Sequence, residues 1–162
     1  MKTKNQKKYK KIIDNRGYFA KLLSQEKNRF FLKKEISEIN LSFNKKKGTI
    51  RGLHYQIGAY KEKKLIYCLK GKAYDVMVNV DKKSKFYKKK LVNIIDSKKN
   101  NFLFIPENYA HGFQTLEKDT ILLYLHSKKY SKRFERSINP FDEEISIKWP
   151  IKKVTISKKD NK

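Results

Sequence analysis

The sequence predicts an all-β fold, a sandwich or barrel, within a single domain that spans residues 1–162. Many short segments alternate apolar and polar residues with a period of two, which is typical of strands. Short turn-like stretches separate these segments, and close spacing of this kind is typical of sandwiches and barrels. Only one segment, "LLSQEKNRFF" at residues 22–31, favours a helix. A chain of this length can bury a core without disulfides.

The first clear strands lie in the middle of the chain. "IRGLHYQ" (Ile50–Gln56) has the composition of an apolar strand, and "LIYCL" at residues 65–69 follows it. The turn-like "KGK" leads into "KAYDVMVNV" at residues 72–80, so we expect the last two segments to form a hairpin. Period two places two polar side chains of the second segment, Asp75 and Asn79, on one face with Ala73 and Met77.

Three more strands are expected at "KLVNIID", "NFLFIP" and "DTILLYLH", with "SKKN" and "ENYAHGFQTLEK" as the separating loops. In the last strand, Tyr124 and His126 share a face with Leu122. The inward face of a sandwich is normally apolar, so this face either meets solvent or lines a cavity. After Trp149 and Pro150, "IKKVTISKKDNK" is a strand-like piece with a basic tail.

The net charge of +25 raises the question of a nucleic-acid partner, because a basic surface attracts phosphates. Only five of the 41 cationic residues are arginine, the residue on which phosphate and base recognition usually depends. The composition therefore favours a solvated, lysine-rich surface and no nucleic-acid partner. Affinity for some other polyanion remains an alternative.

Cys68 is the only cysteine, and its apolar surroundings predict a buried free thiol in a reducing compartment. The first eleven residues carry charge, no apolar segment follows them, and no run reaches the length needed to span a bilayer. We therefore expect a cytoplasmic protein that does not associate with a membrane.

Neither a metal nor a cofactor is expected. The three histidines, His54, His111 and His126, lie far apart in the sequence, with no cysteine or carboxylate at ligand spacing beside them. Glycine-rich phosphate loops and nucleophile elbows are also absent from the sequence. Acid–base chemistry by histidine, tyrosine, lysine and aspartate remains. A lone histidine in an apolar strand is more often a core residue, so "RGLHYQ" alone does not decide the role of His54.

A wider pattern does bear on that role. The strings "DNRGYF", "NLSFNKKKGTIRGLHYQ", "KKLIYCLKGKAYDVMVNVD", "IPENYAHGFQTL", "LYLH" and "NPFDEEISIKWP" occur in this order between about residue 14 and residue 160. Together they resemble the nucleotide-sugar 3,5-epimerases of the dTDP-4-dehydrorhamnose 3,5-epimerase family. The resemblance implies a cupin-like jelly roll with one or two short helices, and a reaction without metal or cofactor. Its substrate would be a nucleoside-diphosphate 4-keto-6-deoxy sugar, inverted at C3, C5 or both.

The resemblance also implies four catalytic residues. His54 falls on the family's general base and Tyr124 on its proton donor. Asp160 matches the carboxylate that orients the histidine, and Lys64 matches the lysine that reaches the C4 oxygen. Other lysines stand close beside Lys64 in the sequence.

For binding, Arg51 and Arg16 resemble the arginines that reach the diphosphate and nucleotide, with Arg16 supplied by the partner subunit of a homodimer. Tyr130 resembles the aromatic residue on which the base stacks. The dimer would exchange an N-terminal strand that completes each site. The other expected substrate contacts are Phe19, Asn40, Gln56, Asp75, His111, Glu135 and Lys159.

Some features leave alternatives open. Lys21 and Glu38 stand where the family commonly has glutamate and glutamine, and one extra residue lies between Asn40 and Arg51, so the nucleotide is dTDP, GDP or CDP. Arg51 and His54 lie on opposite faces of an unbroken strand; a bulge at Gly52 would bring them to one cavity. An epimerase acting at C3 or C5 only, and a non-catalytic cupin-like protein that binds polyanions or glycans, are the remaining alternatives.

Overall fold

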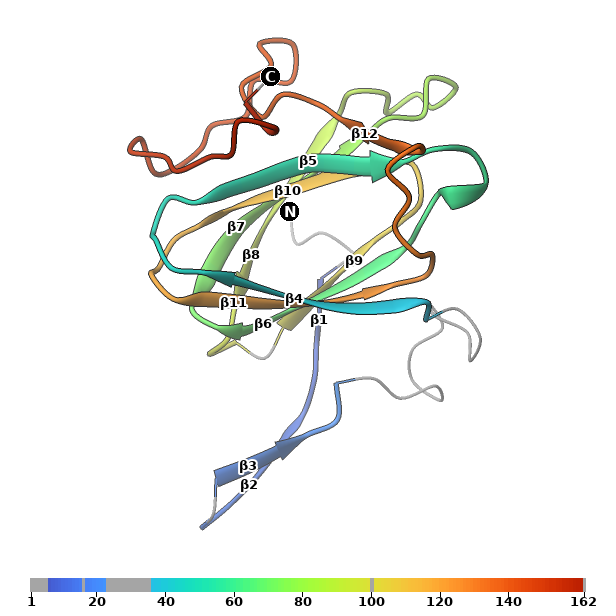
Figure 1. The fold of residues 1–162 in the computed structure, drawn as a ribbon. Helices are drawn as coiled ribbons and strands as arrows, with labels where there is room; N and C mark the ends of the chain where they lie inside the picture. Colours follow the sequence, from blue (N-terminus) through green and yellow to red (C-terminus); the bar gives the residue numbers. More distant parts are fainter. Residues whose placement is uncertain (1–5, 16, 23–35, 100, 162) are drawn as a thin grey trace.

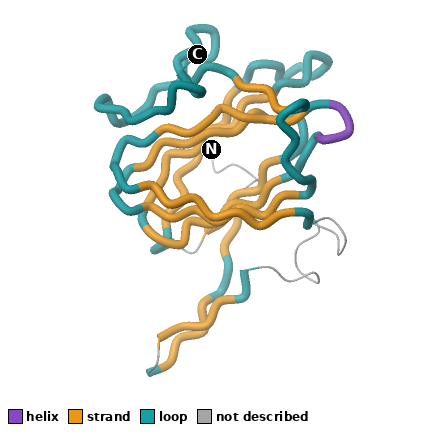
Figure 2. Tube along the Cα trace, in the orientation of Figure 1, coloured by secondary structure: helices purple, strands orange, loops and turns teal. Residues whose placement is uncertain are grey.

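The computed structural model describes the whole chain except residues 1–5, 16, 23–35, 100 and 162. Two five-stranded antiparallel sheets face each other as layers, and most of the described chain is strand or loop (Figures 1 and 2). The predicted all-β sandwich is therefore confirmed. One short 3-10 helix, η1 (Gly58–Tyr60), is present in the described part, where no helix is long and apolar enough to cross a membrane. The expected helix at residues 22–31 lies, apart from Leu22, outside the described residues.

The first sheet has the strand order β1-β9-β6-β11-β4. Its inward face carries an apolar set that includes Ile66, Cys68 and Leu122, and its outward face carries a second set around Leu65 and Tyr67. Both faces of the central strands are therefore apolar. The strands are β1 (Gln6–Lys8), β4 (Glu38–Asn44), β6 (Lys64–Lys70), β9 (Asn101–Ile105) and β11 (Thr120–His126).

The second sheet has the order β12-β5-β10-β7-β8. Its outward face, with Val76 and Val78, is covered by Ile145, Ile147 and Trp149 of the C-terminal segment. The strands are β5 (Ile50–Gln56), β7 (Lys72–Asn79), β8 (Lys90–Asp96), β10 (Tyr109–Thr115) and β12 (Glu135–Ser137).

A third, two-stranded sheet pairs β2 (Lys11–Asp14) with β3 (Gly17–Ala20) and stands away from the two layers (Figure 1). Four large apolar side chains on this hairpin are at least 60% exposed. They are Ile12, Ile13, Tyr18 and Phe19.

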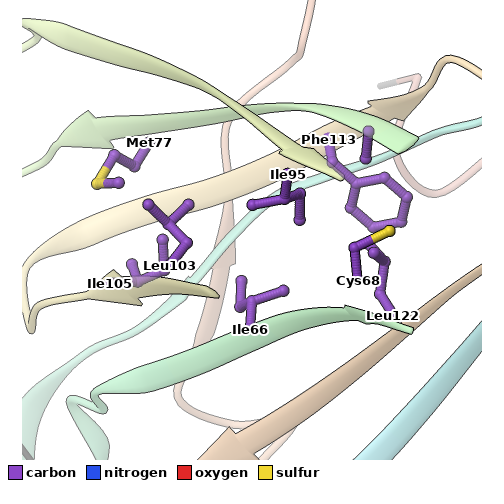
Figure 3. Packing of buried hydrophobic residues seen from close by; sticks show 9 residues of the cluster. Ile66, Cys68, Met77, Ile95, Leu103, Ile105, Phe113 and Leu122 are labelled. Carbon is purple, nitrogen blue, oxygen red and sulfur yellow. The ribbon is translucent and has the colours of Figure 1, made fainter. Parts of the chain in front are cut away.

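The inter-sheet core closes one part of the space between the layers. Side chains of β6, β9 and β11 meet side chains of β7, β8 and β10 there, all of them buried (Figure 3). Tyr124 packs against the edge of this cluster. Cys68 belongs to it as a buried free thiol, as the sequence predicts, and burial raises its pKa to about 12.

Three details differ from the sequence-based expectations. The hairpin of residues 65–69 with 72–80 is wrong: β6 and β7 belong to different sheets, because the single intervening residue Gly71 (φ +78°) turns the chain across the sandwich. The expected loop "ENYAHGFQTLEK" contains β10, which pairs with both β5 and β7. The strand-like C-terminal piece forms only a single parallel bridge, Thr49 to Thr155.

Candidate active site

A cavity of about 660 Å³ lies next to the inter-sheet core and is open to solvent. Strands of both sheets and the C-terminal segment line it. It brings together eight of the residues predicted from the sequence: Asn40, Arg51, His54, Lys64, His111, Tyr124, Lys159 and Asp160.

A bulge in β5 explains how Arg51 and His54 share this cavity. Opposite β10, the register shifts between the pairs His111–His54 and Phe113–Arg51, so one extra residue is accommodated in β5. Gly52 has φ +111°, and a Cβ there would lie 2.5 Å from the Cα of Gly112. Only glycine fits this close approach without displacing backbone. The bulge at Gly52 that the sequence required is therefore present, and it brings Arg51 and His54 to one cavity.

The predicted base is paired with the predicted carboxylate. His54 Nε2 lies 2.9 Å from Asp160 Oδ1, and the backbone N–H of Gly52 donates to Asp160 Oδ2 at 3.3 Å. Burial lowers the pKa of His54 and outweighs the opposing effect of the Asp160 charge, so the imidazole is neutral near pH 7. A proton on Nε2, donated to Asp160, leaves the other ring nitrogen as a free base.

Asp160 reaches His54 because the C-terminal segment is fastened to the start of β5. Thr155 exchanges backbone hydrogen bonds with Gly48 and Ile50. The backbone N–H of Asp160 then donates to the carbonyl and the hydroxyl of Ser157. The carboxylate is only 7% exposed.

Tyr124 enters the cavity from the opposite sheet. Burial raises the pKa of its phenol well above 10, and the nearby Asp75 charge adds to this effect. The hydroxyl therefore keeps its proton at neutral pH and is able to donate it. The ring lies edge-on to His111, with 6.3 Å between ring centroids, and stacks on His126 at 5.9 Å.

Lys64 is the lysine of the run 61–64 that lines the cavity, and it is 7% exposed. Its Nζ lies 3.2 Å from Glu62 Oε1, and the other oxygen of Glu62 lies 2.8 Å from His126 Nδ1. Burial raises the pKa of Glu62, but hydrogen bonds to His126 and Lys64 more than offset this effect and lower it. The carboxylate is therefore ionised at neutral pH.

A second histidine–aspartate pair lies deeper in the second sheet. His111 Nε2 is 2.7 Å from Asp75 Oδ2, and both side chains are buried. Asp75 Oδ1 is also buried and has no hydrogen-bond partner among the described residues. Asp75 therefore pairs with His111, a residue that lines the cavity.

A smaller pocket of about 200 Å³ adjoins the cavity and shares His54, Lys64 and His126 with it. At its rim, Glu135 Oε2 accepts hydrogen bonds from the Tyr130 hydroxyl at 3.0 Å and Lys159 Nζ at 2.7 Å.

The loop that carries Tyr130 is held by Gln56 and Glu38. Gln56 donates to Tyr60 O and Lys129 O and accepts from the backbone N–H of Ser131, while Glu38 accepts from the backbone N–H of Tyr130. The predicted substrate contact Gln56 thus uses its polar atoms to hold this loop. Tyr130 itself is 54% exposed.

Of the other predicted residues that the structure describes, Gln56, Tyr130 and Glu135 line the smaller pocket, and Asp75 and Phe19 line neither. Phe19 lies on the projecting β2–β3 hairpin and is 64% exposed, and Arg16 lies outside the described residues. Two functional candidates were missed by the sequence analysis, Glu62 and His126. The alternation in β11 places His126 on the same face as Tyr124, but no motif marked Glu62. In the part of the chain that the structure describes, no group of three or more His, Cys, Asp and Glu side chains is placed to hold a metal.

Proteins of known family resemble this chain in sequence. Residues 6–162 match the model of the family described as dTDP-4-dehydrorhamnose 3,5-epimerase. The Shigella flexneri protein of that name is 33% identical over 148 residues, which cover 91% of this chain and 82% of the relative.

Solved structures are similar over nearly the whole chain. The Bacillus anthracis dTDP-4-dehydrorhamnose 3,5-epimerase, crystallised with TDP and PPi, matches with a TM-score of 0.90 at 30% identity and covers 96% of this chain and 90% of that one. The Legionella pneumophila dTDP-6-deoxy-D-glucose-3,5-epimerase, in complex with dTDP-4-keto-L-rhamnose, matches with a TM-score of 0.88 at 28% identity, over 96% and 83% of the two chains.

These similarities confirm the cupin-like jelly roll that the sequence resemblance implied. The family match spans residues 6–162, which include both five-stranded sheets and the C-terminal segment. The chain therefore belongs to the dTDP-4-dehydrorhamnose 3,5-epimerase family, isomerases that act on sugar nucleotides.

Proposed function

We propose that the protein inverts C3, C5 or both of a nucleoside-diphosphate 4-keto-6-deoxy sugar, with His54 as the base and Tyr124 as the proton donor. One observation carries this proposal. A neutral imidazole on one sheet and a protonated phenol on the other line a single cavity together with a buried ammonium group. The dTDP-sugar named in the Legionella pneumophila complex supports dTDP as the nucleotide.

Proton removal begins at the carbon next to the C4 carbonyl, where the carbonyl makes the hydrogen acidic. His54 takes this proton through its free ring nitrogen, and the C–H electron pair moves to the C4 oxygen as an enolate. The imidazolium that forms is stabilised by Asp160 at 2.9 Å. The lowered pKa of His54 keeps the imidazole unprotonated before the step.

Lys64 stabilises the enolate oxygen. A buried ammonium group interacts more strongly with a full negative charge than with a ketone oxygen, so it lowers the barrier and not only the energy of the bound substrate.

Tyr124 returns a proton to the opposite face of the ring. Because it belongs to β11 of the first sheet while His54 belongs to β5 of the second, the two groups approach the sugar from different walls. The phenol then regains its proton from solvent, and the imidazolium releases its own. A Tyr124→Phe variant should still exchange the substrate's proton with solvent yet give little inverted product.

We assign the nucleotide to the solvent-facing rim of the main cavity. Arg51 and Lys159 line the cavity and supply positive charge for the diphosphate. The Arg51 Nε donates to Asn44 Oδ1 at 2.8 Å, which leaves the terminal guanidinium nitrogens for a phosphate. The exposed Tyr130 ring offers a stacking surface for the base. Asn40, His111 and Glu135 complete the proposed contacts around the sugar and nucleoside, and Asp75 acts through His111.

The test is proton exchange. The protein is incubated in D₂O with 4-keto-6-deoxy sugars carried on dTDP, GDP or CDP, and NMR counts the deuterons gained at C3 and C5. Deuteration at one carbon alone identifies a single-position epimerase. His54→Ala and His54→Asn should abolish exchange while leaving the melting temperature and dTDP binding nearly unchanged. Absence of exchange with all three nucleotides would refute the proposal, and salt-sensitive binding without turnover would favour the polyanion-binding alternative.

We also propose that the protein is a homodimer. β4 is an edge strand of the first sheet, and Ile39, Leu41 and Phe43 on its outward face are more than half exposed. The β2–β3 hairpin carries exposed apolar side chains as well, Phe19 among them. A second copy would cover these surfaces, and its hairpin would supply Phe19 and Arg16 to the neighbouring site. Light scattering should give twice the chain mass, and Leu41→Lys should reduce it to the monomer mass; a monomeric native protein would contradict the proposal.

A further inference from the structure

Glu62 connects two parts of the site that the proposed mechanism treats separately. One carboxylate oxygen lies 3.2 Å from the Nζ of Lys64, and the other lies 2.8 Å from the Nδ1 of His126. The Glu62 side chain is only 8% exposed, and the Lys64 side chain is 9% exposed. Both oxygens of a buried carboxylate are therefore used, and each has a different partner.

His126 in turn contacts the proposed proton donor. Its ring stacks on Tyr124 with 5.9 Å between centroids and 23° between ring planes. It lines both the main cavity and the adjoining pocket. Lys64, Glu62, His126 and Tyr124 thus form a continuous chain of contacts along one wall.

We infer that Glu62 and His126 are positioning residues for the epimerisation: Glu62 keeps Lys64 charged and aimed at the C4 oxygen, and His126 keeps Glu62 in place. This inference rests on the proposed function. It assigns a role to two side chains that need not touch the substrate themselves.

The physical reason is the cost of burying a cation. An ammonium group with little solvent contact loses its proton unless an anion lies close to it. Neutral Lys64 could not stabilise an enolate. Glu62 is a carboxylate at ion-pair distance, and the His126 N–H occupies its second oxygen. Without that donor the carboxylate is free to rotate away from Lys64.

Other ionisable groups surround Lys64, Glu62 and His126, but Glu62 is the carboxylate that contacts both Lys64 and His126 among the described residues. They come from β4, β5, β7, β10, β11, β12 and the two segments that carry Tyr130 and Asp160. Those that line the two pockets, together with Asp75 beside His111, are Glu38, Arg51, His54, Tyr55, Asp75, His111, Tyr124, Tyr130, Glu135, Lys159 and Asp160.

Glu62→Gln tests the first half of the inference. It keeps the shape of the side chain and removes its charge. We expect kcat for exchange to fall about tenfold or more, a part of the roughly 100- to 1000-fold that loss of an oxyanion donor costs, with KM little changed. The falling limb of kcat at high pH should move to lower pH, because a buried ammonium group without its anion loses its proton more readily. Glu62→Asp, which retains the charge, should restore much of the rate.

Two substitutions test His126: one keeps a hydrogen-bond donor and the other removes it. His126→Asn places an amide N–H near the position of Nδ1 and should keep most of the activity. His126→Phe keeps a ring against Tyr124 but has no donor, so it should lower kcat and shift the pH limb in the same direction as Glu62→Gln. A matched control is Glu117→Gln, because Glu117 lies on the surface, 46% exposed, at 3.8 Å from Lys72. It should change neither rate nor pH profile.

A second measurement is independent of turnover. Acylation of Lys64, followed by peptide mass spectrometry over a pH series, reports its pKa directly in each folded variant. A lower pKa in Glu62→Gln, but not in Glu117→Gln, supports the inference even where no exchange occurs. Failure of the native protein to exchange would refute the proposed function. An unchanged Lys64 pKa and an unmoved pH limb in Glu62→Gln would overturn this inference alone.

Discussion

The pair of His54 and Asp160 gives the sharpest prediction. In Asp160→Asn the amide oxygen can still accept the Gly52 N–H, as Oδ2 does at 3.3 Å. The amide NH₂ then faces His54 Nε2, where Asp160 Oδ1 now lies at 2.9 Å. Nε2 must become an acceptor, so the ring proton moves to Nδ1. The nitrogen that should take the substrate's proton is then already protonated.

The size of the effect follows from the lost charge. A carboxylate in direct contact raises the pKa of a histidine by about 1–3 units, or about 1.4–4 kcal/mol of imidazolium stabilisation. If the transition state carries most of that positive charge, exchange should slow about 10- to 1000-fold, and the tautomer change adds to the loss. The fold should survive, because Asn retains the shape and one hydrogen bond.

Deuterium incorporation at C3 and C5, followed by NMR, measures the rate. The control is Asp119→Asn, the same change at a surface turn whose positive φ asparagine tolerates. The native rate should rise with pH along an acid limb set by His54, and this limb should shift to lower pH in Asp160→Asn. A variant that exchanges within about threefold of the native rate, with an unshifted limb, would refute the idea that the carboxylate supports the base.

Three further outcomes are expected. Acidification should reduce the activity of the native protein only below about pH 6.5, the ordinary histidine pKa, because burial lowers the pKa of His54. The Tyr124 phenol should cause no loss of activity below about pH 10, because burial raises its pKa. Rates measured between pH 5 and 10 check both limits. Gly52→Ala should destabilise the fold by about 1–3 kcal/mol or more in urea unfolding, since its Cβ would collide with Gly112 at positive φ, and an unchanged midpoint would contradict the bulge. The Cys68 thiol, buried and with a pKa of about 12, should resist a thiol reagent until the protein unfolds; rapid labelling of the native protein would place it elsewhere.

The sequence predicted the strand character well and the strand partners poorly. Alternation along residues 72–80 and 119–126 identified strands and their faces, because side-chain direction is a local property. The expected hairpin across Gly71 was wrong, because a turn-like residue does not say whether the chain returns to the same sheet or crosses to the opposite one. β10 was missed for a related reason. Its Gly112 resembles a loop residue, yet it is there because β5 approaches too closely for a Cβ.

The residues of the candidate site also divide into those that local sequence motifs predicted and those whose roles depend on long-range contacts. Local motifs and their order identified His54, Lys64 and Tyr124, all of which line one cavity in the structure. The use of Gln56 to hold a loop, and the bridge made by Glu62, depend on contacts between segments distant in the sequence. Such contacts leave no local signature.

The thickness of the sandwich has its own consequence for product stereochemistry. Packed sheets lie about 10 Å apart, and the side chains of the inter-sheet core fill that space here. Phe113 belongs to both the buried cluster and the cavity lining, so one side chain both separates the two sheets and forms part of the cavity wall. Under the proposed mechanism, a swollen or thinned interior would change how often a planar enolate is quenched from the wrong side. The stereochemical fidelity of the reaction would then depend on how the side chains of the inter-sheet core pack.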